Sequence, residues 1–185
     1  MGKPLGSNYW NYDGLLERYK YDEKAYRILE DVLKNSNFIT LSEYHEQEDG
    51  NVDCKIYDSH GNILFCLEHE YSTKVYKSFW IKGVKLRDGH YLNTNPRTLL
   101  CRLFYDGKIA ALVSVDMFYK YAEKCGEGWK NAYGETIYNY SAPTESKFIW
   151  FARTTDLKFI FEYYSKYKKF PLSKLVNYER LEEIL

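Results

Sequence analysis

The spacing of apolar residues changes from a helical to a strand period near residue 38. Between Tyr21 and Lys34, apolar side chains recur every three or four positions, and charged side chains take the other side. These apolar positions are Ala25, Ile28, Leu29, Val32 and Leu33. The spacing predicts an amphipathic helix with one buried face. Residues 1–12, which contain glycine, proline and asparagine, are expected to form a loose lead-in.

Strand spacing begins at Phe38–Tyr44 and is clearest in the next two segments. Residues 52–57 alternate between apolar and polar side chains, as a strand with one buried face does. Residues 63–67 are all apolar, as in a strand buried on both faces. The turn between them contains Gly61, which can adopt the positive φ that a tight turn requires. The two segments therefore predict a β-hairpin.

The rest of the chain continues to mix strands with helices. Residues 99–105 and 109–115 are expected to form a second hairpin, because Asp106-Gly107 is a strong turn signal. Residues 125–145, which are rich in glycine and asparagine, are expected to form a loop. Further expected elements are helix 117–124 capped by Asp116, strand 146–153, helix 157–168 capped by Asp156, and helix 178–185 capped by Asn177. We therefore predict an α+β fold with a mixed central β-sheet flanked by helices, in a single domain covering residues 1–185.

The second strand of the first hairpin ends in a pair of carboxylates, Glu68 and Glu70. They share one face of the strand and lie roughly 6 to 7 Å apart. A two- or four-residue turn would pair Asp53 with Cys66 and bring its carboxylate within one diagonal step of Glu68. A three-residue loop with Gly61 as the bulge residue would turn Asp53 to the other face. We expect the first register, which groups the three acids in one place. Like charges this close need a cation or a raised pKa to be tolerated.

Three carboxylates at one end of a strand pair offer only oxygen ligands. Such a set suits Mg²⁺ or Mn²⁺, which bind a few carboxylates together with water and phosphate oxygens. An ion of this kind can activate a water molecule and stabilise the attack on a phosphodiester. The expected metal ligands are Asp53, Glu68 and Glu70.

The order of a helix, a strand, an Asp-bearing strand and a Glu-X-Glu strand resembles the PD-(D/E)XK phosphodiesterase superfamily of restriction enzymes and related nucleases. The resemblance covers about residues 21–120 and implies a restriction-endonuclease-like core. It implies that Asp53 is the first acid and Glu68 the second. Glu70 stands where the superfamily usually has lysine, and some of its restriction enzymes also carry glutamate there. The helix sometimes lends a further acid, for which Glu30 is the candidate.

Cations interleaved with aromatic residues follow the acids from Ser72 to Arg87, without an acid among them. This pattern suits contact with a phosphate backbone and unstacked bases, although the same cations could simply offset the preceding acids. The candidate nucleic-acid ligands are Lys77, Lys82, Lys85 and Arg87. Lys74, with Lys77 as the alternative, is the candidate to supply the catalytic cation that Glu70 does not provide. Lys55 would share the face of Asp53 in the expected register.

Composition modifies this picture only slightly. The formal net charge is +0, which counts against a strongly basic nucleic-acid binder but permits a local basic face. The 20 tyrosines are expected to build the core and a half-exposed surface, with base stacking as the alternative. The cysteines at 54, 66, 101 and 125 lack paired spacing, so neither a zinc site nor a redox motif is indicated. No apolar run is long enough for a membrane span, and a cytoplasmic protein with free thiols is expected.

Three interpretations follow from these patterns. The first is an endonuclease that uses Mg²⁺ or Mn²⁺ to hydrolyse nucleic acid, DNA rather than RNA. A homodimer is compatible with this interpretation. The second is a non-catalytic binding or inhibitory protein of the phage or mobile-element type, which the glutamate at position 70 and the zero net charge favour. The third is an unrelated α+β domain whose acids face solvent.

Overall fold

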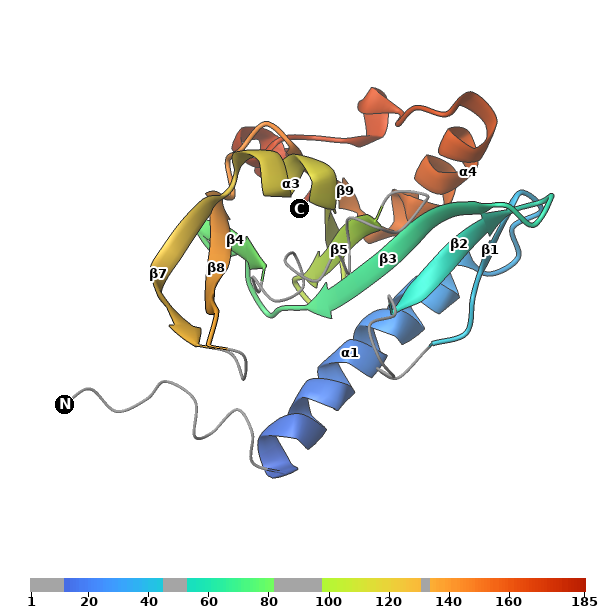
Figure 1. Ribbon diagram of the computed structural model, residues 1–185. Coiled ribbons are helices and arrows are strands. Elements are labelled where there is room, and N and C mark those ends of the chain that lie inside the picture. Colours follow the sequence, from blue (N-terminus) through green and yellow to red (C-terminus); the bar gives the residue numbers. More distant parts are fainter. Residues whose placement is uncertain (1–11, 45–52, 82–97, 131–133) are drawn as a thin grey trace.

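The computed structural model describes residues 12–44, 53–81, 98–130 and 134–185. It shows a mixed six-stranded sheet and a separate three-stranded sheet, with helices packed against them (Figure 1). The predicted α+β class with a mixed central sheet is confirmed, whereas the second sheet was not predicted. Within the described residues, none of the helices combines the length and the apolar character needed to cross a membrane. Residues 1–11 of the predicted lead-in and the cations Lys82, Lys85 and Arg87 lie outside the described residues.

Helices α1 (Tyr12–Leu33) and α4 (Leu157–Tyr167) cover one face of the central sheet (Figure 1). The predicted apolar face of α1 is confirmed, since Ala25, Leu29 and Leu33 are buried. The helix begins earlier than predicted, because residues 12–20 contain one glycine and no proline and nothing in them ends a helix. On α4, Phe161 is fully buried and its ring lies 5.6 Å from that of Phe65. These contacts form the larger of the two apolar clusters.

The central sheet has the strand order β1-β2-β3-β5-β6-β9. Its strands are β1 (Ile39–Leu41), β2 (Cys54–Asp58), β3 (Ile63–Tyr71), β5 (Thr98–Phe104), β6 (Ile109–Ser114) and β9 (Ile149–Arg153). Neighbouring strands are antiparallel except β3 and β5, which are parallel. The predicted hairpins and the strand before α4 are therefore confirmed, with shifts of a few residues at their ends.

The register of the β2–β3 hairpin differs from the expected one. Lys55, and not Asp53, lies opposite Cys66. The loop is the three-residue alternative, closed by a hydrogen bond of 2.8 Å from Asp58 N to Asn62 O, with Gly61 at φ +82°. A β-bulge then follows, because Tyr57 pairs with Ile63 while Ile56 pairs with Phe65. The loop and the bulge each shift the register by one residue, so together they restore the expected face of every β2 side chain.

The three-stranded sheet replaces the loop predicted at residues 125–145. Its order is β4 (Ser78–Ile81), β8 (Thr136–Pro143) and β7 (Glu123–Lys130), all antiparallel. The loop prediction was wrong. Gly126 and Gly128 adopt positive φ in an irregular stretch of the β7–β8 ladder, so this strand lacks the alternation of apolar and polar side chains that is typical of strands. Buried Phe79 and Ala142 connect this sheet to the second apolar cluster, on the opposite face of the central sheet from α1.

One predicted helix cap is wrong. Helix α3 (Val115–Tyr121) begins after Ser114, so Asp116 lies inside its first turn. Asp156 occupies the predicted N-cap position of α4, at the end of the 3-10 turn Thr154–Asp156, but its side chain makes no capping hydrogen bond and accepts one of 3.0 Å from Lys174. The predicted cap at Asn177 is confirmed, since its side chain accepts a hydrogen bond from Arg180 N at the start of the 3-10 helix Tyr178–Glu183. Another 3-10 turn, Leu172–Lys174, follows α4.

Candidate functional site

Glu68 is a buried carboxylate near the end of an apolar strand. It follows the buried apolar residues of β3, and 3 % of its surface is exposed. In the parallel ladder it lies opposite Leu100, which belongs to the apolar cluster on the side of α3 and the second sheet. Charged side chains are rarely buried so deeply unless something compensates their charge. Glu68 is therefore the acid in this region that most suggests a function.

Asp53 lies immediately before β2 and is also buried, with 7 % of its surface exposed. Continuing the observed register by one residue places it opposite Glu68. Its Oδ2 accepts a hydrogen bond of 2.9 Å from the backbone N–H of His69, which lies between the two glutamates in sequence. The carboxylate thus extends the β2–β3 ladder by one contact and is held against β3.

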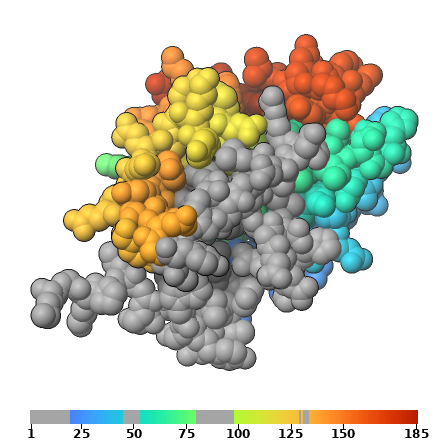
Figure 2. All heavy atoms as spheres, viewed as in Figure 1, coloured from blue at the N-terminus to red at the C-terminus, as the bar shows by residue number. Residues whose placement is uncertain are grey.

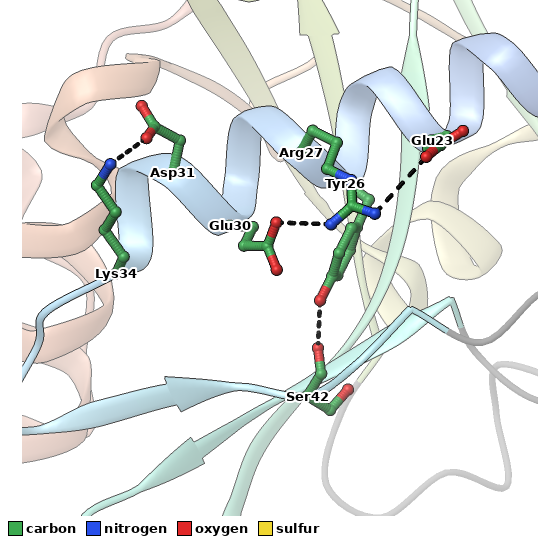
Figure 3. A network of polar contacts seen from close by, with 7 residues as sticks. All are labelled: Glu23, Tyr26, Arg27, Glu30, Asp31, Lys34 and Ser42. Carbon is green, nitrogen blue, oxygen red and sulfur yellow. Dashed lines mark hydrogen bonds and ion pairs between the residues drawn. The ribbon is translucent and has the colours of Figure 1, made fainter.

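His69 occupies the opposite face of β3 from Glu68. It is buried beside the rings of Tyr26 and Tyr44, at centroid distances of 6.1 and 5.4 Å. The hydroxyl of Tyr26 donates a hydrogen bond of 3.0 Å to the carbonyl of Ser42, which fixes this ring between α1 and β1 (Figure 3). The Nδ1 atom of His69 lies 4.0 Å from Asp53 Oδ2. The packing around the imidazole therefore also constrains the position of Asp53.

Glu70 is paired with a cation that the sequence analysis did not identify. Its Oε2 accepts a hydrogen bond of 2.5 Å from Arg102 Nε and forms an ion pair with Nη2 of the same guanidinium. The Arg102 side chain is 8 % exposed, and its guanidinium lies 4.2 Å from the ring centre of Phe79. The sequence did contain a signal for this pair, because Arg102 is the single charged residue of the apolar strand 98–104 and a buried cation requires a partner.

Of the predicted cations, Lys55 lies on the face of Glu68. It pairs with Cys66 across the β2–β3 ladder, as expected for a residue that shares the face of Asp53. Burial is the main cause that raises the pKa of Cys66; the Lys55 charge lowers this pKa and the Glu68 charge raises it. Lys74 and Lys77 are exposed after β3, and the Lys74 ammonium lies 5.3 Å from the ring centre of Tyr76.

The helix acid Glu30 is not brought to this region as a free carboxylate. It accepts a hydrogen bond of 2.9 Å from Arg27, which also lies 3.6 Å from Glu23 (Figure 3). All three side chains are about half exposed or more on the outer side of α1. Glu30 thus takes part in a surface ion-pair network, of the kind that contributes little to stability.

The described residues contain no group of three or more His, Cys, Asp or Glu side chains arranged to hold a metal ion. Glu70 is directed to Arg102, which leaves Asp53 and Glu68 as the carboxylates on adjacent strand ends. The charges of both acids act on Cys54. The pKa of Cys54 is raised well above its ordinary value, mainly by burial, then by Asp53, Cys101 and Glu68. Mg²⁺ commonly binds one or two protein carboxylates and completes its shell with water and phosphate oxygens. This donor pair therefore fits Mg²⁺, with the other ligands coming from solvent or substrate.

The cysteines provide a test of how tightly this region is closed. Burial raises the pKa of Cys54 and of Cys66, and that of Cys101 to about 12, whereas Cys125 on β7 is partly exposed. We expect Ellman's reagent at about pH 8 to label only Cys125 rapidly in the native protein, because the other thiols are protonated and inaccessible. The Cys125→Ser variant should then lose the rapid phase. Rapid labelling of Cys54 in that variant would show that the β2–β3 hairpin opens readily.

The assignment of the acids has no support from known relatives. Comparisons of the chain with protein-family models, with curated proteins and with solved structures give no match in any of the three.

Proposed function

We propose that the protein is a divalent-metal-dependent phosphodiesterase that acts on nucleic acid, as a DNA endonuclease, with Asp53 and Glu68 as the metal ligands. The observation that carries this proposal is the pair of buried carboxylates on adjacent ends of β2 and β3. The element order α1, β1, β2, β3 supports it, because this is the order expected of a restriction-endonuclease-like core. A bound Mg²⁺ or Mn²⁺ would supply Lewis-acid stabilisation of the phosphoryl oxygens and an activated water.

The surrounding residues have separate positioning roles in this proposal. The backbone N–H of His69 orients the Asp53 carboxylate, and the packed rings of Tyr26 and Tyr44 hold His69 in place. Burial in β3 limits the motion of Glu68, so that little ordering is required when a ligand binds.

Arg102 is the cation that we assign beside these acids. In the parallel ladder, Glu70 and Arg102 lie opposite each other, two residues beyond Glu68 and Leu100. Their side chains therefore share the face of Glu68. Glu70 would position the guanidinium, and the guanidinium would place positive charge where the superfamily usually has a lysine. This assignment replaces Lys74 as the catalytic cation, and Lys77, Lys82, Lys85 and Arg87 remain the proposed contacts to the nucleic-acid backbone.

Thermal unfolding in increasing Mn²⁺ tests whether the acid pair binds metal. A protein that binds metal only when folded gains about 2.7 kcal/mol of unfolding free energy at a metal concentration a hundred times the dissociation constant. We expect the wild type to be stabilised in this way and Glu68→Gln, which keeps the shape of the side chain, to lose the effect. Glu30→Gln removes an acid of the same type from the surface of α1 and should retain it. Equal stabilisation of wild type and Glu68→Gln would refute the metal site.

A non-catalytic binding protein is the second candidate. Two of the three predicted metal ligands make contacts within the protein, and these contacts favour this candidate. Asp53 accepts a hydrogen bond from the His69 backbone, and Glu70 accepts one from Arg102. In this case the acids serve the fold, and Mn²⁺ should leave the unfolding temperature of the wild type unchanged. The same titration therefore separates the two candidates.

A further inference from the structure

A cavity of about 660 Å³ lies where the central sheet meets α3. Its floor is formed by Leu99, Leu112 and Trp150, from the three adjacent strands β5, β6 and β9. In the ladders, Leu112 lies opposite Trp150 and also opposite Cys101, which shares its strand face with Leu99. Because Glu68 pairs with Leu100, the floor is on the opposite face of the sheet from Glu68.

The walls of the cavity come from α3 and from the segment after α4. Met117 and Tyr121 project from α3, and Phe170 and Leu175 come from the C-terminal segment. Figure 2 shows the yellow atoms of α3 and the orange to red atoms of this segment along the same upper part of the molecule. The ring of Tyr121 stacks on that of Phe148, with centroids 5.8 Å apart. The lining is therefore mostly apolar and aromatic, and the volume is within the range of roughly 300–1,000 Å³ typical of small-molecule sites.

The polar groups of the lining gather where β6 ends and β9 begins. Ser114 is the last residue of β6, and Ser146 and Lys147 lie in the turn just before β9; all three line the cavity. Ser114 precedes α3, but its side chain makes no capping hydrogen bond to that helix. The Ser146 hydroxyl donates a hydrogen bond of 2.6 Å to the carbonyl of Pro143. The Ser114 hydroxyl is thus available to a bound molecule.

The charge of the lining is positive. Lys147 is exposed and takes part in no ion pair, and no carboxylate is among the lining residues, in the part of the chain that the structure describes. A single cation beside a hydroxyl, at one end of an apolar surface, complements an anionic head group attached to an apolar body. An apolar molecule without a charge would leave the ammonium unused, and a cation would be repelled.

We propose that this cavity binds a small amphipathic carboxylate. Its apolar body lies against Leu112, Trp150 and Leu175, and its carboxylate accepts hydrogen bonds from Lys147 and Ser114. This site is independent of the acid pair and of the proposed phosphodiesterase activity.

Decanoate is the probe for this site, and the indole N–H resonance of Trp150 is the reporter. The resonance is identified in ¹H–¹⁵N spectra by its loss in Trp150→Phe. We expect decanoate to shift it in a saturable manner and to bind more tightly than decanol. An unshifted Trp150 resonance, or equal affinity for decanoate and decanol, would overturn the proposal.

Two variants locate the head group and the apolar body. Lys147→Glu should weaken decanoate binding by roughly threefold to tenfold, as expected for the loss of a partly exposed ion pair, and should leave decanol binding unchanged. Met117→Glu should weaken both ligands, because it places a charge in the apolar wall. Lys166→Glu makes the same charge change on the exposed surface of α4, outside the lining, and should bind decanoate as the wild type does. Equal decanoate affinity in Lys147→Glu and Lys166→Glu would contradict the assignment of Lys147.

Discussion

Replacing Glu68 by alanine is expected to abolish Mg²⁺-dependent cleavage of DNA, with a loss of at least about a thousandfold in rate. In the proposed function, a bound ion would stabilise the developing charge by several kcal/mol, and each 1.36 kcal/mol corresponds to about a tenfold change in rate. Loss of one of the two proposed carboxylate ligands would remove most of this contribution. Asp53→Ala should have an effect of similar size. The measurement is the conversion of supercoiled plasmid to nicked and linear forms, with Mg²⁺ or with EDTA.

The controls separate chemistry from folding. Glu68→Gln keeps the volume of a side chain that is 3 % exposed, so it should unfold at a temperature close to that of the wild type in the absence of metal and still be inactive. Glu30→Gln should cleave normally, because this acid forms a surface pair with Arg27. Cleavage by both Glu68→Gln and Asp53→Ala at the wild-type rate would exclude these residues from the reaction and favour the non-catalytic alternative.

Replacing Phe161 by alanine is expected to lower the free energy of unfolding by about 3–5 kcal/mol. Phe161 is fully buried on α4 and packs its ring on Phe65 of β3, so its removal leaves a cavity between helix and sheet. Unfolding in urea, followed by circular dichroism, measures the change through the shift of the midpoint. This is a large part of the total stability of a domain of this size.

The matched control is Phe159→Ala, two residues earlier on the same helix. Phe159 is 46 % exposed and contacts the ring of Tyr163 at a centroid distance of 5.9 Å. Its removal should cost about 1 kcal/mol or less, because nearly half of the side chain already faces water. Comparable losses in the two variants would contradict the packing of α4 against β3.

The apolar pattern predicted the elements that bury a continuous face. The buried residues of α1 and α4 recur at helical spacing, and Asp106-Gly107 joins two strands buried along almost their whole length. β7 could not be found in this way, because its described side chains are all exposed or only partly buried. Its backbone nevertheless pairs with β8. Periodicity detects burial and not hydrogen bonding, so a solvent-facing strand leaves little trace in the sequence.

The candidate site shows the same limit. A period of two determines which face a side chain occupies, but a shift of the register by two residues leaves every face unchanged. The three-residue loop and the bulge together produce such a shift, so Lys55 lies opposite Cys66 on the face of Glu68. Asp53 precedes the strand, and its carboxylate contacts the backbone N–H of His69. The partner of Glu70 could not be predicted locally, because Arg102 is 32 positions away on a parallel strand.

The parallel pairing of β3 with β5 has a consequence for the connection between them. Parallel neighbours cannot be joined by a tight turn, so a longer connection must link the end of β3 to the start of β5. This single connection, residues 72–97, starts next to Glu70 and ends next to Leu99 on the cavity floor. A deletion that shortened it would strain both places at once, whereas a shorter hairpin turn would disturb only one pair of strand ends.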